Sequence, residues 1–160
     1  MPGEDNKALI RRFYKEIDEG NLDAIDELVA ENYLDRSPPP FPGIGSGREG
    51  LKQSFRMFWD ATPGRHEIED QVAEGDKVVT RLTAYGVHGR DLPGSPATGR
   101  QVKMIGTAIH RIENGKITEK WSDKGHPGPP AATWRPAAGP AALTATKTRY
   151  PARRKAPPWN

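Results

Sequence analysis

The dipeptide Asn114-Gly115 constrains the fold of this chain more than any other feature of its sequence. Asparagine and glycine are the residues that best tolerate the positive φ angles of a two-residue β-turn. The flanking segments 102–112 and 117–122 are rich in β-branched residues. The sequence therefore predicts two antiparallel strands joined by a tight turn. Because alternate residues of a strand point to the same side, the turn also helps to predict which side chains share a face.

Three segments with helical patterns and two further strand-like segments precede this hairpin. Apolar side chains recur every three or four residues in 9–17 and 22–29. A third helix is expected over 46–59, whose first four residues form a capping box. Segments 66–72 and 78–88 are predicted strands. This order indicates an α+β fold, a cone-shaped barrel in which a curved, mainly antiparallel sheet of four strands wraps round N-terminal helices and encloses a pocket.

The net charge of +3 hides a division of the chain. All 21 acidic residues lie in 1–123, whereas seven of the 24 lysines and arginines lie in 124–160. The first part is therefore mildly acidic, and the overall positive charge is no argument for a nucleic-acid partner. We expect one folded domain over 4–123, followed by a basic tail rich in proline, alanine and arginine.

The tail, residues 124–160, is predicted to be disordered. It contains eight of the 16 prolines, and Leu143 is its only large aliphatic residue. Such a segment buries too little apolar surface to offset the entropy lost on ordering. The alternative is a basic arm for nucleic acid or an acidic partner, built on Arg153, Arg154 and Lys155.

Several classes of protein and site are excluded by composition. The chain has no cysteine, so disulfides and cysteine-based metal sites are ruled out. Its four histidines lack the spacing of a metal site, and no metal is expected. The acidic start, Met1–Asp5, does not resemble a secretory signal, and no stretch approaches the ~18 apolar residues of a membrane span. A cytoplasmic protein without a membrane partner is therefore expected.

Six short motifs occur in a characteristic order and spacing within residues 6–123. They are Leu9–Tyr14, Gly20–Glu27, Asn32–Leu34, Tyr85–His88, Pro96–Arg100 and His110–Ile117. Together they resemble the SnoaL-like polyketide cyclases. These belong to the nuclear-transport-factor-2-like superfamily, with ketosteroid isomerase and limonene epoxide hydrolase as relatives.

The resemblance implies an enzyme without a cofactor that acts on a small hydrophobic molecule by acid/base chemistry. Aldol-type cyclisation, isomerisation or epoxide hydrolysis would fit, and a homo-oligomer, such as a homodimer through the sheet face, is expected. Cyclisation needs a group that removes a proton next to a carbonyl and a donor that stabilises the enolate oxygen. A domain that binds a small ligand or dimerises without catalysis is the alternative.

The resemblance also identifies positions where this chain departs from the family. Characterised cyclases carry an acid/base aspartate on the last strand and a histidine two residues before it. These positions hold Ser122 and Lys120 here, counted from the hairpin turn. A glutamine and a histidine on the preceding strand correspond to Gly106 and Ala108. All four polar positions are changed.

His110 and Asp123 are the titratable residues nearest to these positions and the candidate catalytic residues. His110 shares a strand face with Ala108. The alternative to a catalytic role is a polar residue at the cavity mouth or a structural histidine. Asp123 faces inward only if the strand bulges or ends there, because parity places it opposite to Ser122. The residues expected to line the pocket are Tyr14, Phe55, Trp59, Met104, Ala108, Lys120 and Ser122. The aromatic residues among them would also suit a simple core.

Asp35 and His66 are further titratable residues upstream. Asp35 precedes the proline-rich segment 37–42 and either points into the cavity or caps that loop. His66 lies on a weakly alternating strand and is expected to be solvated.

The segment 126–134 admits a second explanation besides a disordered tail. SnoaL-like chains commonly end in an apolar segment resembling Thr-Leu-Gly-Leu-Leu-Gln-Gln-Leu-Gly. One allowed set of codons for 126–134 encodes that ending when it is read one base later. A single inserted base near Lys124 is therefore a hypothesis for the abrupt change in composition.

Overall fold

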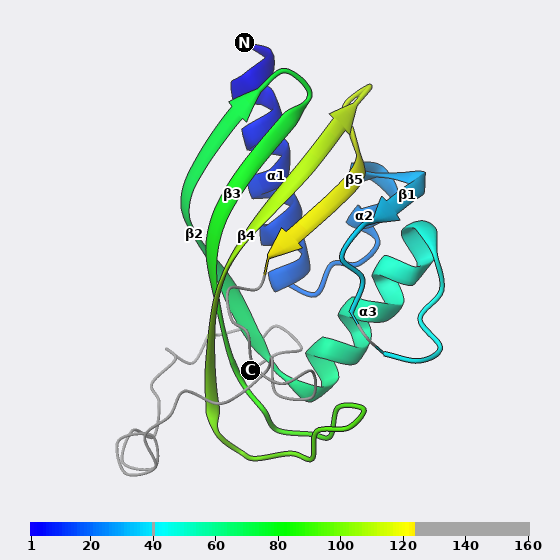
Figure 1. The fold of residues 1–160 in the computed structure, drawn as a ribbon, viewed down its shortest axis with the longest axis vertical. Coiled ribbons are helices and arrows are strands. Elements are labelled where there is room, and N and C mark those ends of the chain that lie inside the picture. Colours follow the sequence, from blue (N-terminus) through cyan, green and yellow to red (C-terminus); the bar gives the residue numbers. More distant parts are fainter. Residues whose placement is uncertain (40, 124–160) are drawn as a thin grey trace.

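Three helices and five strands make up residues 1–39 and 41–123, the part of the chain that the computed structural model describes. In chain order they are α1 (Pro2–Asp18), α2 (Ala24–Leu28), β1 (Val29–Asp35), α3 (Gly47–Ala61), β2 (Gly64–Glu74), β3 (Lys77–Val87), β4 (Gln101–Glu113) and β5 (Lys116–Asp123). The strands form one curved sheet in the order β1-β5-β4-β3-β2, as Figure 1 shows. The predicted α+β architecture is confirmed, whereas the predictions for 124–160 lie outside the described residues.

The hairpin predicted at Asn114-Gly115 joins β4 to β5. Both turn residues have positive φ angles, 51° and 72°. The pairing shifts by one residue beyond Ile112, so that Ala108 lies opposite Ser122 and His110 opposite Lys120. This bulge is what gives β5 the predicted face, because an unshifted hairpin would have turned Ser122 to the other side.

Strand β1 was not predicted, and the sheet has five strands instead of four. Val29, which the sequence pattern assigned to the second helix, is the first residue of β1. The strand pairs in parallel with β5, with Asp35 opposite Lys120. Its partner lies 85 residues later in the chain, and parallel pairing leaves no turn signal in the sequence. A local pattern therefore could not reveal it.

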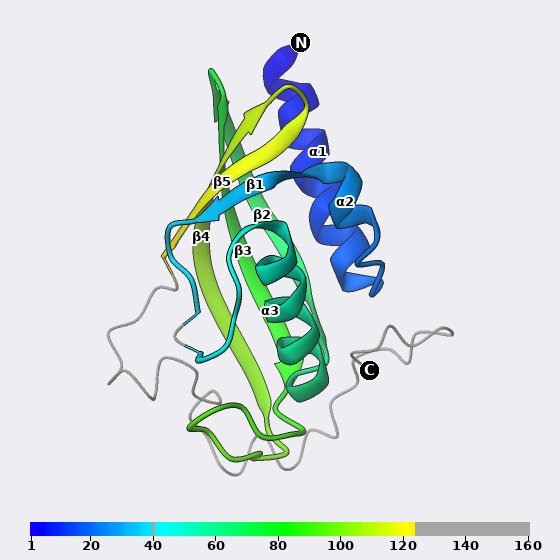
Figure 2. The same cartoon turned by 90° about the vertical axis from the view of Figure 1, so that its right-hand side faces the viewer.

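All three helices lie on one side of the sheet (Figure 2). Helix α1 packs against β2 and β3, and α3 packs against β1. The core between helices and sheet includes Ile10, Phe13, Ile17, Val78 and Ile112. No helix of the described residues covers the opposite face of the sheet. The sheet therefore curves around the helices on one side only.

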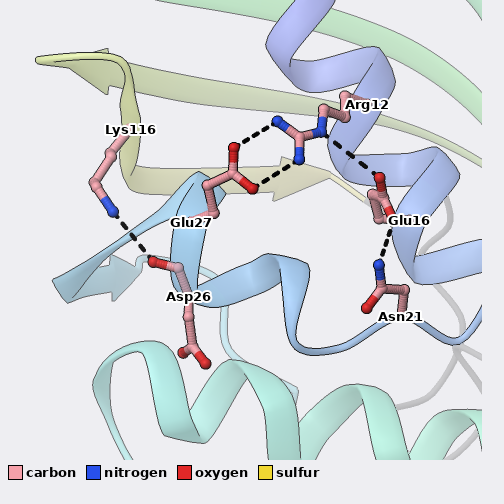
Figure 3. Close-up of polar contacts among 6 residues, drawn as sticks. All are labelled: Arg12, Glu16, Asn21, Asp26, Glu27 and Lys116. Carbon is pink, nitrogen blue, oxygen red and sulfur yellow. Dashed lines mark hydrogen bonds and ion pairs between the residues drawn. The ribbon is translucent and has the colours of Figure 1, made fainter.

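Helix α2 is tied to its neighbours by polar contacts on the surface (Figure 3). Arg12 on α1 donates hydrogen bonds to both carboxylate oxygens of Glu27, each at 2.7 Å. Lys116 on β5 donates to the backbone carbonyl of Asp26 at 3.1 Å. The hydrogen bond from Arg12 lowers the pKa of Glu27. Because these groups are exposed, water screens them, and they orient α2 more than they stabilise the fold.

Helix α3 follows Ser46, as the capping box predicts, but the serine hydroxyl makes no capping hydrogen bond. None of the helices described is both long and apolar enough to cross a bilayer.

Candidate active site

A cavity of about 180 Å³ lies between the concave face of the sheet and helices α1 and α3. Strands β3, β4 and β5 form its floor, and the two helices form its roof. The residues expected from the sequence are among those that border it: Tyr14, Phe55, Trp59, Met104, Ala108, Lys120 and Ser122.

Aromatic rings form one wall of this cavity. Phe55 and Trp59, one turn apart on α3, stack with 5.3 Å between ring centroids and 21° between ring planes. Phe13 on α1 meets Phe55 edge-on at 6.0 Å. Across the cavity, β4 presents the small residues Gly106 and Ala108. An apolar space lined by aromatic rings and small strand residues favours a hydrophobic ligand with planar parts.

An ion pair connects β1 and β5 at the edge of the cavity. Lys120 Nζ lies 3.0 Å from Asp35 Oδ2, and the two side chains are only 18% and 16% exposed. The other carboxylate oxygen of Asp35 accepts a hydrogen bond from the backbone N–H of Ser37 at 2.9 Å. Asp35 therefore both borders the cavity and caps the loop that follows, which combines the two alternatives left open by the sequence.

Two tyrosine hydroxyls lie within the field of this carboxylate. Burial, with smaller contributions from Asp18 and Asp35, raises the pKa of Tyr14. Burial, followed by Asp35, raises the pKa of Tyr33 well above its ordinary value. The Tyr33 hydroxyl has no hydrogen-bond partner among the described residues. Both phenols therefore keep their protons at neutral pH and can act as hydrogen-bond donors.

His66, which borders the cavity, forms a hydrogen-bonded dyad with Asp18, which does not. The distance from His66 Nδ1 to Asp18 Oδ1 is 2.7 Å, and the His66 backbone N–H donates to Asp18 Oδ2 at 2.8 Å. The His66 ring packs on Tyr14 with 5.0 Å between centroids. The prediction that His66 is solvated is wrong, because its side chain is only 20% exposed. The available sequence signal was the position of Asp18, one helical turn after Tyr14 on the same face.

The dyad stands between the cavity and a second hollow. That hollow lies between α1 and β2 and is bordered by Asp18, Lys15 and Ile68. Tyr14 and His66 border both spaces. The His66 side chain thus lies between the cavity and the hollow on the outer side of α1 and β2.

His110 occupies a different environment from the one predicted for a catalytic histidine. It is 1% exposed and lies against the rings of Phe13 and Tyr14, at 6.0 and 5.9 Å between centroids. It is not among the residues that border the cavity. Within the described chain, neither ring nitrogen has a hydrogen-bond partner. Burial and, to a lesser extent, Lys120 lower its pKa to about 3, so the imidazole is neutral.

Asp123 and Ser122 both border the cavity, although they are neighbours on one strand. Asp123 is exposed and stands at the end of β5, opposite Thr107. It therefore meets the condition set by the sequence, that the strand ends there. The backbone N–H of Ser122 donates to Ser37 Oγ at 3.1 Å. In the described residues, no group of three His, Asp or Glu side chains could hold a metal ion.

The family model described as SnoaL-like polyketide cyclase matches residues 8–123, nearly the whole of the described fold. The chain belongs to the SnoaL-like polyketide cyclase family. Two curated relatives are aklanonic acid methyl ester cyclases. DauD from Streptomyces sp. (strain C5) is 30% identical over 145 residues, covering 82% of this chain and 89% of the relative. DnrD from Streptomyces peucetius is 30% identical over 141 residues, covering 80% and 96%.

Solved structures support the same membership. TsrD from Streptomyces laurentii superposes with a TM-score of 0.66 at 26% identity, covering 75% of this chain and 87% of TsrD. A candidate polyketide cyclase from Bacillus cereus ATCC 10987 superposes with a TM-score of 0.64 at 31% identity, covering 76% and 74%. This SnoaL-like chain thus shares the curved sheet and N-terminal helices of cyclase structures, and its family supports cyclase-type catalysis.

Proposed function

We propose that this SnoaL-like chain closes a ring in a polyketide-like ketone by an aldol-type reaction that needs no cofactor. The observation that carries the proposal is the set of groups around one apolar cavity: an imidazole oriented by a carboxylate, a buried phenol and an ammonium group. Aldol closure needs a base at the carbon beside a carbonyl and donors at the oxygens where negative charge develops. The cavity offers each of these.

The proton acceptor in this proposal is His66. With Nδ1–H donating to Asp18 at 2.7 Å, the neutral ring presents Nε2 as its acceptor. Asp18 also stabilises the imidazolium that forms when the substrate gives up its proton, as in other carboxylate–histidine pairs. The outer hollow beside the dyad lets this proton return to solvent. The cavity thereby contains a base even though the family's usual acid/base positions hold Ser122 and Lys120.

Tyr14 and Lys120 are the proposed partners of the substrate oxygens. Tyr14 is protonated at neutral pH, as an ordinary tyrosine is, and burial raises its pKa further, so its hydroxyl can donate to an enolate or an alkoxide. The Lys120 ammonium places a positive charge at the edge of the cavity beside Asp35, in surroundings where water screens it little. Together they would stabilise the negative charge that develops on the carbonyl oxygen when the neighbouring carbon loses its proton.

Asp123 is a second candidate for proton transfer, since it borders the same cavity. His110 is poorly suited, because it is buried behind Phe13 and Tyr14.

The cavity is smaller than the roughly 300–1,000 Å³ of most ligand pockets. In the proposal the ring that closes lies against Phe55 and Trp59, and the rest of the substrate extends past Asp123.

Aklanonic acid methyl ester is the first substrate to test, because both curated relatives act on it by name. The full chain is incubated with the ester, and cyclised product is quantified by chromatography. We expect His66→Gln to lower kcat/KM by roughly 10²–10⁴-fold, and Tyr14→Phe by roughly 10²-fold. His110→Leu, outside the cavity lining, is the matched histidine control. Tight binding of the ester without turnover by the wild type would instead favour a ligand-binding domain.

A further inference from the structure

Lys120 is the lysine that borders the cavity among the residues described. Lysine side chains usually extend their ammonium group into water. Lys120 instead remains 18% exposed beside the cavity, with one carboxylate partner. By contrast, Lys52, also buried, has two carboxylate partners, Asp26 at 2.7 Å and Glu49 at 3.5 Å. Of these two buried amines, Lys120 is therefore the one with an apolar space beside it.

The position of this amine is set by the backbone and not by the side chains alone. Asp35 and Lys120 are paired residues of the parallel strands β1 and β5. The backbone N–H of Arg36 donates to the carbonyl of Lys120 at 2.8 Å. The carboxylate is fixed in turn by the Ser37 N–H at 2.9 Å. Lys120 and Asp35 are therefore preorganised: little side-chain entropy is lost when they bind a ligand.

Entry of an apolar ligand changes the balance between the charged form of the Lys120–Asp35 pair and its neutral form. A lone ion pair depends on residual water for much of its stability, and loss of that water favours the neutral amine and carboxylic acid. The proton of the Lys120 ammonium can then pass to Asp35 across the 3.0 Å hydrogen bond. A neutral amine in a desolvated pocket is a nucleophile toward carbonyl carbon. The buried neutral ring of His110, opposite Lys120 on β4, adds no competing charge.

We propose that Lys120, whose ammonium first pairs with a ketone oxygen of the substrate, loses a proton to Asp35 and forms a covalent iminium with that ketone. The amine adds to the carbonyl carbon, and Asp35 returns its proton to the oxygen. The nitrogen then gives one of its protons to the Asp35 carboxylate, and Asp35 passes it to the hydroxyl group. The oxygen leaves as water with these two protons, and a C=N bond replaces the C=O bond. The iminium acidifies the neighbouring C–H, which His66 deprotonates to give an enamine. The enamine carbon attacks the second carbonyl, which forms the C–C bond and restores the C=N bond. Tyr14 protonates the new alkoxide and regains a proton from the His66 imidazolium, whose ring packs on it at 5.0 Å. Water then adds to the C=N carbon, which restores the ketone and releases the Lys120 amine. No oxidant, reductant or metal takes part.

This inference rests on the proposed function and assigns the substrate class more narrowly, to ketones and β-diketones that an amine can reach. A carboxylic ester alone would not form the iminium. The same cavity that holds a planar polyketide would then also hold a small β-diketone, whose condensation product with an amine is a conjugated, stable enaminone.

The experiment uses 2,4-pentanedione as the probe on the full chain. We expect a new near-ultraviolet absorbance and one added pentanedione less one water, located by peptide mapping at Lys120. Lys120→Arg keeps the charge beside Asp35 and should lose the adduct. Lys103→Arg, which changes an exposed lysine next to Tyr85, should retain it. Thermal unfolding of each variant verifies that it is folded, and the wild-type peptide map decides the question if Lys120→Arg does not fold.

The absence of an adduct, or equal labelling of exposed lysines, would overturn the inference. The outcome is separable from the proposed function. Cyclisation of the polyketide ester without any adduct at Lys120 would overturn the iminium alone. An adduct at Lys120 in a chain that cyclises nothing would leave the amine chemistry standing and overturn the proposed cyclase activity.

Discussion

Replacing His110 by leucine should remove a large part of the acid sensitivity of this fold. The buried imidazole has its pKa lowered from 6.5 to about 3, mainly because burial disfavours the charged ring. An unfolded chain titrates near 6.5, so below that pH the unfolded state binds more protons than the folded state. The contribution of His110 to stability is therefore fully present above about pH 6.5 and is lost as the pH falls toward about 3.

The magnitude follows from the separation of the two pKa values. Each pH unit below 6.5 costs about 1.4 kcal/mol, so lowering the pH from about 7.5 to about 5 should remove about 2 kcal/mol from the wild type. His110→Leu should lose less over the same interval by that amount, because the contribution of this buried imidazole is absent from it. Urea unfolding at both pH values measures the difference, and an unchanged m value verifies that both chains unfold alike. Equal losses in the two chains would show that the imidazole titrates in the folded state, and would refute its burial.

Three further predictions concern the convex face of the sheet, the glycine at the start of β2 and the tail. The exposed convex face carries Val79 and Ile105, which are 36% and 46% exposed, and we expect a second copy of the chain to cover them. Val79→Lys combined with Ile105→Lys should then convert a dimer to a monomer in light scattering, whereas a monomeric wild type would contradict the expectation. Gly64→Ala should lower the free energy of unfolding by about 1–3 kcal/mol, because the added Cβ would lie 1.8 Å from the carbonyl oxygen of Tyr85. Gly89→Ala is the control, since a Cβ there would lie 3.9 Å from its nearest neighbouring atom. Truncation after Lys124 should lower the melting temperature by no more than a few degrees, the shift that corresponds to about 1 kcal/mol or less, and a large fall would show that the tail belongs to the domain.

The strand faces around the cavity could be predicted because they depend on neighbouring residues. Asn114-Gly115 fixed the hairpin, and alternation then grouped Met104 with Ala108. On β5 alternation alone was insufficient. The one-residue shift beyond Ile112 decides that Lys120 faces inward. Counting from the hairpin turn predicted that Lys120 faces inward, and this placement holds only because of that shift.

The dyad and the first strand could not be predicted from local pattern. His66 and Asp18 are 48 residues apart, and only the packing of α1 against β2 brings them together. Strand β1 pairs with a segment that follows 85 residues later. His110 was placed on the correct face of β4, but the cover provided by Phe13 and Tyr14 depends on where α1 lies. Long-range packing therefore decides that His66 borders the cavity and that His110 does not.

Proton abstraction by His66 is the central claim, and hydrogen exchange at carbon tests it without requiring ring closure. The probe is a polyketide methyl ester that lacks the acceptor carbonyl, incubated with the full chain in D₂O. We predict that the wild type exchanges the protons beside the ketone by NMR, that His66→Gln slows this exchange by roughly 10²-fold or more, and that His110→Leu leaves it unchanged. Equal exchange by wild type and His66→Gln, or no exchange above the buffer rate, would contradict the account.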